Sequence, residues 1–491
     1  EMQRSLVGSE MCIRDRDKLV SRKRECEELQ RCLESDRSEF VIISGRRRIG
    51  KTYLIDKFFN YKYDFTFVGE HKTPATVQIQ NFMRAIHRQS KKRQPKATTW
   101  YDAFNALEDY LETLPSNRKK VIFIDEMPWM DTQRSNFVSA LENFWNGWGN
   151  RRTDIVLIAT GSATSWMADK IEGNQGGLHA RITCNLHLSP FNLRETEEYL
   201  RQRNCQWDRY QLLQCYMIFG GVPFYLSLLN PSDSLAQNID RLFFAEGAQL
   251  KGEFDELYNA LFAQADSYVS IVKLLSENKA GMTREDILRA TGIEGTFLSK
   301  ILKNLECCDF ITRLSQYGNK TRNSLFRLTD FFTLFYYKFI EPNNTKDERW
   351  WSNNIDSRSV LSWMGLGFEL VCLSHHKQIK IALGIAGVGT SVSTWRSKAD
   401  SESGIPGFQI DLIIERADRI IHLCEMKFST DLYGITDSYE SKLRERTGLF
   451  RLATKNKKAL VITFVTTYGV VNGKHKSIVH SEVKMDDLFN S

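Results

Sequence analysis

The chain has 491 residues, of which 42% are hydrophobic and 26% charged, and its formal net charge is +7 at pH 7. This length predicts several domains, and the composition is typical of a globular protein. No apolar run is long enough to cross a bilayer and no signal peptide is visible, so we expect a cytoplasmic protein without a membrane partner. The ten cysteines form no CxxC pair, which suggests neither a zinc site nor a disulfide framework, and the mild charge permits a nucleic-acid partner without requiring one.

The first residues do not read as part of a domain. The stretch LVGSEMCIRDR, residues 6–16, resembles the translation of a sequencing adapter of the transposase type. We therefore expect residues 1–16 to be an artefact and exclude them from reasoning about the fold.

A phosphate-binding motif follows the first predicted strand. FVIISGRRRIGKTYLIDKFF, residues 40–59, reads as strand, loop and helix, and the loop matches GxxxxGK[ST]. Its backbone N–H groups and the helix N-terminus would bind the phosphates of ATP, Lys51 would neutralise the β- and γ-phosphates, and Thr52 would bind Mg²⁺. The alternative is a chance match in a loop rich in glycine and lysine. The candidate nucleotide-binding residues are Gly45, Arg46, Arg47, Arg48, Ile49, Gly50, Lys51, Thr52 and Tyr53.

Two acids follow a second predicted strand in KKVIFIDEMPW, in which residues 121–124 are apolar. The carboxyl end of a parallel strand is where open α/β sheets bind their ligands. Asp125 is predicted to hold Mg²⁺ through its water shell, and Glu126 to act as the catalytic base that orients the attacking water. The alternative, that the two acids only cap the next helix, does not explain their place after a phosphate-binding loop.

A third predicted strand, in DIVLIATGSATSW, ends with Thr160 and Ser162, whose hydroxyls can touch the γ-phosphate or the lytic water. Arg181 precedes a further apolar strand, and an arginine at the γ-phosphate can stabilise the charge of the transition state. The alternative for Arg181 is an ordinary surface position. Its place in the sequence does not say whether it would reach the nucleotide of its own chain or that of a neighbour in a homo-oligomer.

Together these motifs resemble the prokaryotic, archaeal-type ATPases of the AAA+/STAND branch. The resemblance rests on SGRRRIGKT, FIDEMPWM, LIATGSA, GGLHARIT and FGGVPFYL. It implies an α/β fold with an AAA-type parallel sheet over residues 17–195 and a helical lid over 196–254. In the family a Gly-x-Pro segment of the lid contacts the nucleotide, which makes Pro223 a further candidate. The family also has Val-Gly-Arg near the adenine, where this chain reads Val20-Ser21-Arg22.

Residues 255–345 predict a winged helix-turn-helix. Three short helical patterns are followed by ITRLSQYGNKTRNSLFRLTD, two strands around a Gly-Asn turn. If this domain binds double-stranded DNA, we expect contacts from the third helix and from the wing. The alternative is a relay that packs against the lid. The candidate DNA-contacting residues are Lys300, Lys303, Lys320, Arg322 and Arg327.

Residues 346–491 carry an acid–base pattern. Asp411 lies on one strand of a predicted hairpin, Glu425 and Lys427 lie on the other, and Glu369 lies on the preceding helix. The pattern resembles the PD-(D/E)xK nuclease core and implies a restriction-endonuclease-like α/β domain. The resemblance implies that the carboxylates bind a second divalent metal ion and that Lys427 orients or deprotonates the attacking water. Burial could lower the pKa of Lys427.

The pattern departs from that family at Ile410, which stands where the motif has proline. The alternative reading is a cross-strand ion pair that needs no metal. His375 and His376 lie nearby in the sequence and are expected to be surface residues rather than ligands.

The sequence therefore predicts an ATP- and Mg²⁺-dependent P-loop ATPase with two alternative outputs. In the first, the nucleotide state is coupled to DNA binding or cleavage. In the second, the chain is a nucleotide-dependent signalling switch, and its C-terminal domain is a non-catalytic interaction module.

Overall fold

The computed structural model describes residues 19–92, 95–162, 166–167, 178, 181–262, 264–318, 324–397 and 407–490. The chain forms two compact units. The first comprises the residues up to Pro190 together with the short segment Ala260–Ala263, and the second comprises Phe191–Asn259 and Gln264–Ser491. The predicted artefact, residues 1–16, lies outside the described residues. Among the described helices, none combines the length and the apolar character that a membrane span requires.

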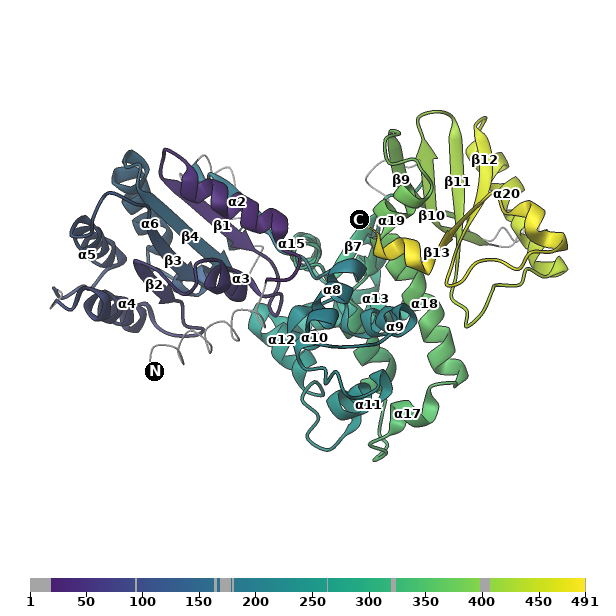
Figure 1. Ribbon diagram of the computed structural model, residues 1–491, viewed down its shortest axis with the longest axis horizontal. Helices are drawn as coiled ribbons and strands as arrows, with labels where there is room; N and C mark the ends of the chain where they lie inside the picture. Colours follow the sequence, from purple (N-terminus) through teal and green to yellow (C-terminus); the bar gives the residue numbers. More distant parts are fainter. Residues whose placement is uncertain are drawn as a thin grey trace, which may run out of the picture. The chain divides into compact units, whose positions relative to one another are not determined.

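The first unit is built on a five-stranded sheet in which every pair of neighbours is parallel, with the order β2-β3-β4-β1-β5 (Figure 1). The strands are β1 (Glu39–Ser44), β2 (Phe65–Val68), β3 (Lys120–Asp125), β4 (Ile155–Gly161) and β5 (Cys184–His187). Because β4 lies between β1 and β3, the carboxyl ends of these three strands are neighbours at one edge of the sheet. The α/β, parallel-sheet core predicted from the sequence is confirmed.

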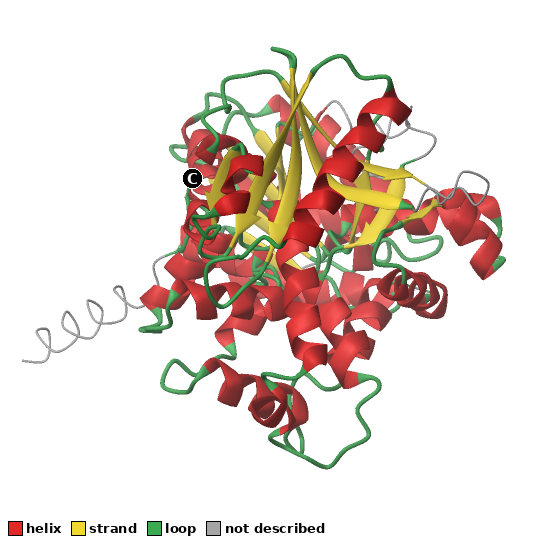
Figure 2. Cartoon of the chain, turned by 90° about the vertical axis from the view of Figure 1, so that its right-hand side faces the viewer, coloured by secondary structure: helices red, strands yellow, loops and turns green. Residues whose placement is uncertain are grey.

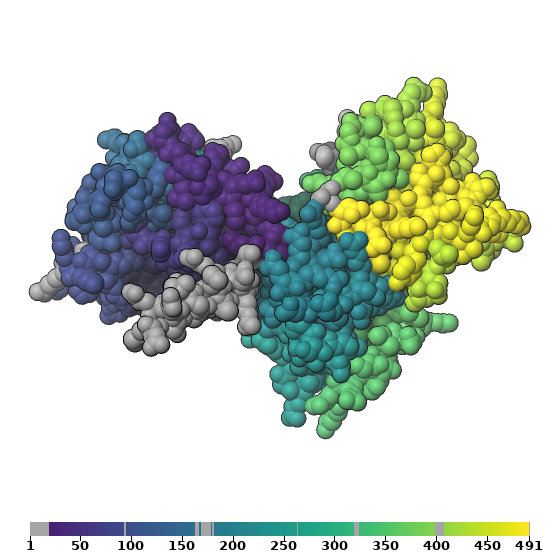
Figure 3. All heavy atoms as spheres, viewed as in Figure 1, coloured from purple at the N-terminus to yellow at the C-terminus, as the bar shows by residue number. Residues whose placement is uncertain are grey.

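Helices cover both faces of this sheet. Alternate residues of β1 point to opposite faces, so Phe40 and Ile42 join one core cluster and Val41 and Ile43 the other. The first cluster packs against α4 (Ala75–Ser90), α5 (Trp100–Glu112) and α6 (Phe137–Gly147), and the second against α2 (Lys23–Glu34) and α3 (Lys51–Phe58). The polar side of α2 stays on the surface, where Figure 3 shows it in dark purple. The two layers fix β1, and with it the start of α3.

The second unit contains helices and short helical turns on both sides of residues 265–328 in the sequence. These are α8 (Leu193–Gln202), α9 (Arg209–Phe219), α10 (Pro223–Ser227), α11 (Leu235–Ile239), η5 (Asp240–Phe244), α12 (Glu253–Leu261), α16 (Phe331–Phe335), η7 (Tyr336–Ile340), α17 (Trp350–Asn354), α18 (Arg358–Ser374) and α19 (His376–Ala382). The first N–H of α8, at Leu193, donates to Nε2 of His375 at 3.1 Å. Burial lowers the pKa of His375 to about 4, so its neutral ring can accept this bond. The expectation of a surface position is therefore wrong for His375, which ties the end of α18 to the start of α8.

Residues 265–328 form three helices and a small antiparallel sheet. The helices are α13 (Ala265–Glu277), α14 (Arg284–Thr291) and α15 (Gly295–Cys307). The strands are β6 (Met282–Thr283), β7 (Ile311–Leu314) and β8 (Leu325–Leu328), in the order β6-β8-β7. The predicted strands on either side of the Gly-Asn turn are thus present, although residues 319–323 lie outside the described part of the chain.

The C-terminal part contains a five-stranded mixed sheet with the order β13-β12-β11-β10-β9. Its strands are β9 (Thr390–Ser397), β10 (Phe408–Arg416), β11 (Ile420–Lys427), β12 (Ala459–Thr466) and β13 (Ser481–Lys484). Strand β10 pairs antiparallel with both β9 and β11. Strand β12 pairs parallel with both β11 and β13. The long helix α20 (Asp437–Thr454) packs Leu443 and Phe450 against this sheet (Figures 1 and 2).

Candidate functional site

The loop between β1 and α3 has a backbone that depends on its two glycines. Gly45 has φ +142°, and a Cβ placed there would lie 2.4 Å from the carbonyl oxygen of Leu188. Gly50 has φ +83° and immediately precedes α3. Both conformations disfavour any residue with a side chain, so the glycines of the motif are required by the turn. The loop therefore ends at the N-terminus of α3, where backbone N–H groups remain available to an anion.

Lys51, the first residue of α3, is 5% exposed. Its ammonium donates to the carbonyl oxygens of Gly45 (2.9 Å) and Arg46 (3.1 Å) and to Oγ of Ser162 (2.9 Å). Lys51 and Ser162, predicted separately from two motifs, are thus in direct contact. The lysine lies between the loop after β1 and the residue that follows β4.

The other predicted loop residues differ in exposure. Arg46 and Ile49 are buried, and Ile49 belongs to the core cluster on the α2–α3 face. Arg47 and Arg48 are half-buried, whereas Thr52 and Tyr53 are exposed at the start of α3. The residues open to a ligand are therefore those at the helix start.

Asp125, the last residue of β3, is held by hydroxyl groups. Its Oδ2 accepts a hydrogen bond from Oγ1 of Thr52 at 2.8 Å, and its Oδ1 accepts one from Oγ1 of Thr160. Thr160 also accepts a bond from the backbone N–H of Glu126 at 3.2 Å. Thr52 and Asp125, the two residues predicted to serve Mg²⁺, are therefore in contact.

Glu126 turns back toward the end of β4. Its backbone is in the left-handed region with φ +49°, a conformation that is uncommon for a residue with a side chain. Its carboxylate accepts hydrogen bonds from the N–H of Ser162 at 3.1 Å and from its hydroxyl at 2.5 Å. Ser162 thus links the loop lysine to the predicted base.

This set of groups fits a nucleotide with Mg²⁺. Thr52 and Asp125 supply hard oxygen donors, which Mg²⁺ prefers, and the N-terminus of α3 with the Lys51 ammonium supplies positive charge for phosphate oxygens. Asp125 makes no ion pair among the described residues, so a metal ion would have to displace only neutral donors from it.

A buried glutamine that sequence reasoning missed supports the segment after Glu126. Gln78 on α4 donates to the carbonyl oxygens of Thr73 (3.0 Å) and Trp129 (2.8 Å), and it accepts from the N–H of Glu70 (3.2 Å). It thereby joins the turn after β2 to the turn after β3. The only signal in the sequence was a polar residue within the apolar face of a helix.

Two of the predicted site residues make no contact with Lys51, Thr52, Asp125, Glu126 or Ser162 among the interactions of the described residues. Arg181 is exposed in the turn that precedes β5. Pro223 begins α10, which belongs to the second unit. Their contacts with a nucleotide stay predictions.

Comparisons with known proteins find a matching family and a similar protein sequence. Residues 19–229 match the family described as an ATPase domain predominantly from Archaea. The match to this family is confined to the part of the chain that ends at residue 229. An uncharacterized protein of Methanocaldococcus jannaschii, MJECL04, is 27% identical over 333 residues, which cover 66% of this chain and 69% of that protein.

Two solved structures are also similar, each at 18% identity. The Walker-type ATPase PABY2304 of Pyrococcus abyssi has a TM-score of 0.47, and the match covers 65% of this chain and 96% of that one. The ORC2 protein of Aeropyrum pernix, solved as ADPNP–ADP complexes, has a TM-score of 0.39, with 70% and 95% covered.

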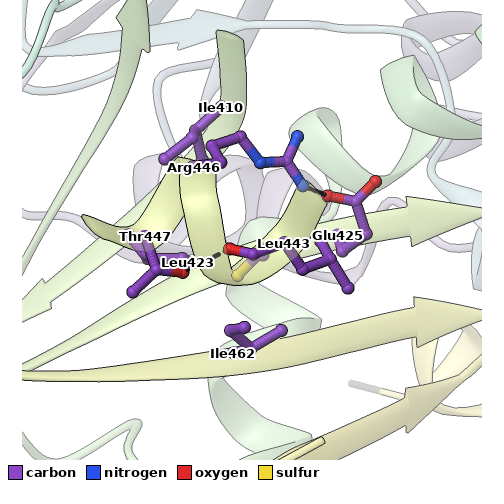
Figure 4. Close-up of a pocket in the computed structure, with 8 residues that line it drawn as sticks. Ile410, Leu423, Glu425, Leu443, Arg446, Thr447 and Ile462 are labelled. Carbon is purple, nitrogen blue, oxygen red and sulfur yellow. Dashed lines mark hydrogen bonds and ion pairs between the residues drawn. The ribbon is translucent and has the colours of Figure 1, made fainter. Parts of the chain in front are cut away.

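In the C-terminal sheet, Glu425 is surrounded by hydrogen-bond donors. Its carboxylate pairs with the ammonium of Lys427 at 2.8 Å and with the guanidinium of Arg446, and it accepts a bond from the hydroxyl of Tyr439. Figure 4 shows Arg446 reaching Glu425 across the small pocket between β11 and α20. Burial alone would raise the pKa of Glu425, but Arg446 and Lys427 together outweigh burial and lower it.

The surroundings of Lys427 favour its charged form. Burial would lower its pKa, but the Glu425 carboxylate and the Tyr439 hydroxyl raise it above the ordinary value. The expected lowering of the lysine pKa is therefore wrong in this arrangement. The alternative reading of an ion pair that needs no metal describes Glu425 and Lys427.

The other two acids share an arginine. Arg327 of β8 lies with one guanidinium nitrogen 3.7 Å from Oε2 of Glu369 and another 3.6 Å from Oδ1 of Asp411. Arg327 is 3% exposed. Burial, and then the neighbouring Asp411 carboxylate, raise the pKa of Glu369 to about 7.

These acids do not fit a second divalent metal. Glu425 is paired with Lys427 and Arg446, while Glu369 and Asp411 flank Arg327. In the part of the chain that the structure describes, no group of three or more Asp, Glu, His or Cys side chains is placed to hold a metal ion. Each of the predicted metal ligands thus lies beside a cationic side chain of the protein, and Glu369 and Asp411 share one arginine.

The predicted DNA-contacting residues also separate. Lys300 and Lys303 are exposed on α15, whereas Arg327 is buried against acids. Lys320 and Arg322 lie outside the described residues. Arg327 is therefore corrected from a wing contact to an internal ion-pair partner, because its strand faces the C-terminal acids.

Proposed function

We propose that the chain is an ATP-driven switch, which binds and hydrolyses ATP with Mg²⁺ in the first unit and changes the state of the second unit. The archaeal-type ATPase domain over residues 19–229 supports the nucleotide chemistry. The observation that carries the proposal is the chain of contacts from Lys51 through Ser162 to Glu126, beside the Thr52–Asp125 pair.

Each residue has a role that follows from its place. Lys51 would exchange its bonds to backbone carbonyls for bonds to phosphate oxygens, which carry more negative charge. That exchange would free Ser162 from Lys51 and loosen its hold on Glu126, whose carboxylate could then orient a water molecule. Mg²⁺, when bound with ATP beside Thr52 and Asp125, would neutralise charge on the phosphates.

Phosphate release by the purified protein tests this proposal. Lys51→Ala should abolish ATP binding in calorimetry, whereas Lys23→Ala, an exposed lysine on α2, should bind as the wild type does. Glu126→Gln should still bind ATP but hydrolyse it about 10²–10⁴-fold more slowly, because a general base is lost. The matched control is Glu27→Gln, also exposed on α2. Wild-type turnover in Glu126→Gln would contradict the assigned base.

For the second unit, the interaction-module reading is the better supported output. We infer that residues 346–491 form a restriction-endonuclease-like fold used for contact rather than cleavage, since each of the four predicted nuclease residues is engaged in an ion pair. Purified protein should not nick plasmid DNA with either Mg²⁺ or Mn²⁺. Nicking that disappears in Lys427→Ala would instead establish the nuclease reading.

Double-stranded DNA binding is the second candidate, through a winged helix over residues 255–345. It is favoured by Lys300 and Lys303, which lie exposed on α15, the third helix of this part of the chain. Fluorescence anisotropy with a DNA duplex should show salt-dependent binding that Lys300→Glu with Lys303→Glu weakens on all sequences. Lys442→Glu, an exposed lysine on α20, is the control. Equal affinity of the double variant and the control would exclude this surface.

Arg181 bears on whether the switch works as a homo-oligomer. Its exposed position is compatible with a role at a neighbour's nucleotide. If it acts in this way, mixing Arg181→Ala protein with Glu126→Gln protein should restore ATP turnover, because one interface then has both residues. Absence of any recovery would leave Arg181 with a role in its own chain or on the surface.

A further inference from the structure

We propose that the β-ribbon of the second unit, which we define as residues 311–317 with β8, is a built-in blocker of the C-terminal acidic pair. Arg327 occupies the position between Glu369 and Asp411 that a metal ion would otherwise take. The proposal goes beyond ATP binding and hydrolysis and does not depend on them.

The charges favour this reading. Arg327 contributes the cation from the ribbon, whereas Glu369 lies on α18 and Asp411 on β10. An arginine with only 3% of its surface exposed needs anionic partners, because burial of an unpaired charge is very unfavourable. The two nitrogen–oxygen distances, 3.7 and 3.6 Å, are longer than those of hydrogen bonds, so the guanidinium lies between the acids without a tight bond to either. Such a contact is easier to replace than a bidentate pair.

The ribbon is also joined to the C-terminal sheet through its backbone. The N–H of Tyr317 donates to the carbonyl oxygen of Thr394 at 2.7 Å, and the N–H of Thr394 donates to that of Ser315 at 2.9 Å. Gln316 pairs with Thr394 as a parallel bridge, so residues 315–317 extend the sheet beyond its edge strand β9. This is the geometry by which a peptide adds to an exposed sheet edge.

Side chains complete the docking. The ring of Tyr317 packs on that of Phe450 at 5.0 Å between centroids, and its hydroxyl donates to Glu415 at 3.3 Å. The ribbon thus contacts the C-terminal part through a short backbone pairing, an aromatic contact, one arginine and the hydroxyl of Tyr317, which also accepts a hydrogen bond from the side-chain amide of Asn456. These contacts lie at a sheet edge, where a ribbon can detach while the sheet itself stays folded.

The blocker predicts two states of the acidic pair. With the ribbon docked, the Arg327 guanidinium lies between Glu369 and Asp411 and leaves no place for a divalent cation. With the ribbon detached, two neighbouring carboxylates would be left without their cation and would attract one.

Mn²⁺ binding by the full chain without nucleotide, measured by electron paramagnetic resonance, tests the proposal. The wild type and Arg327→Lys, which keeps the charge, should bind no Mn²⁺ that depends on Asp411. Arg327→Gln should bind about one Mn²⁺ per chain at least ten-fold more tightly than the wild type, and Asp411→Asn in that background should remove the binding. Hydrogen exchange at residues 315–317 should be at least ten-fold faster in Arg327→Gln.

Tyr317→Ala, which removes the ring contact with Phe450, is the second variant in case Arg327→Gln does not fold. It must also gain Mn²⁺ binding that depends on Asp411. The proposal is overturned if the wild type binds Mn²⁺ through Asp411, or if the folded variants bind none. ATP turnover of the same wild-type sample reports separately on the proposed function, so loss of turnover alone would leave the blocker intact.

Discussion

The nucleotide site and the C-terminal acidic cluster both bring a lysine and carboxylates together beside the carboxyl ends of strands, but they neutralise their charges differently. Asp125 is held by the hydroxyls of Thr52 and Thr160, and Lys51 by backbone carbonyls and a serine. Glu425, in contrast, is paired directly with Lys427 and Arg446. A site whose charged side chains contact only neutral groups can still bind a metal ion and a phosphate. A site whose charged side chains pair with one another has no charge left for such ligands. The same residue types therefore predict a ligand in one region and internal stability in the other.

The largest expected effect follows from Asp125. Asp125→Asn should lower ATP turnover by about 100-fold or more, because a metal ligand worth several kcal/mol is lost. The unfolding midpoint of the first unit should stay unchanged, since the amide can still bond with both threonine hydroxyls. Phosphate release and thermal unfolding measure the two effects, and Asp109→Asn, exposed on α5, is the control. A large loss of stability would show that Asp125, like Glu425, stabilises the fold, and the two sites would then not differ in this respect.

A substitution of His375 tests whether a neutral hydrogen-bond acceptor contributes to the unfolding free energy of the second unit. Its pKa of about 4 in the folded state lies below the ordinary value of 6.5, so its contribution is complete above pH 6.5 and is lost as pH falls toward 4. The stability advantage of the wild type over His375→Gln should shrink by about 3 kcal/mol across that window. Urea unfolding at several pH values measures it, with His480→Gln, an exposed histidine, as the control. A constant difference between wild type and His375→Gln would show that the ring does not titrate.

Glu425→Gln probes the completed site. Lys427 and Arg446 would lose their shared anion while partly buried, and we expect a loss of about 2–4 kcal/mol in the unfolding free energy of the second unit. ATP turnover should stay at the wild-type level. Urea unfolding compared with Glu445→Gln, an exposed residue next to Arg446 on α20, isolates the effect. Unchanged stability together with reduced metal-dependent activity would return Glu425 to the nuclease reading.

Much of the first site could be predicted because its residues belong to short motifs. The P-loop carries its own turn glycines, and Asp125, Glu126 and Ser162 each follow an apolar strand. Parallel strands bring their carboxyl ends to one edge, so motifs far apart in the sequence meet at a known place. In the C-terminal part, the hairpin of β10 and β11 and the helix before it were also indicated, but β9, β12 and β13 were not predicted.

The partners of the C-terminal acids could not be predicted in the same way. Arg446 lies 21 residues after Glu425 on a helix, and Arg327 comes from a ribbon 84 residues before Asp411. Nothing in the local pattern of Arg446 or Arg327 distinguishes an internal ion pair from a surface charge. Only the docking of β8 beside α18 and β10 decides that Arg327 faces acids.

The smallest expected effect concerns the start of the first unit, where Ser21 stands at the position of a glycine in the family that the sequence resembles. Its φ of +63° is in the left-handed region, which costs about 1 kcal/mol for a residue with a side chain. Ser21→Gly should remove this strain, but the unfolded chain gains freedom, so we expect a net stabilisation of about 0.5 kcal/mol. Differential thermal unfolding against Ser35→Gly, which has an extended backbone after α2, provides the comparison. A gain that is larger in the presence of ATP than in its absence would mean that the segment from Val20 to Arg22 also contacts the nucleotide, as the family resemblance implies, whereas destabilisation would show that the serine side chain has a role of its own.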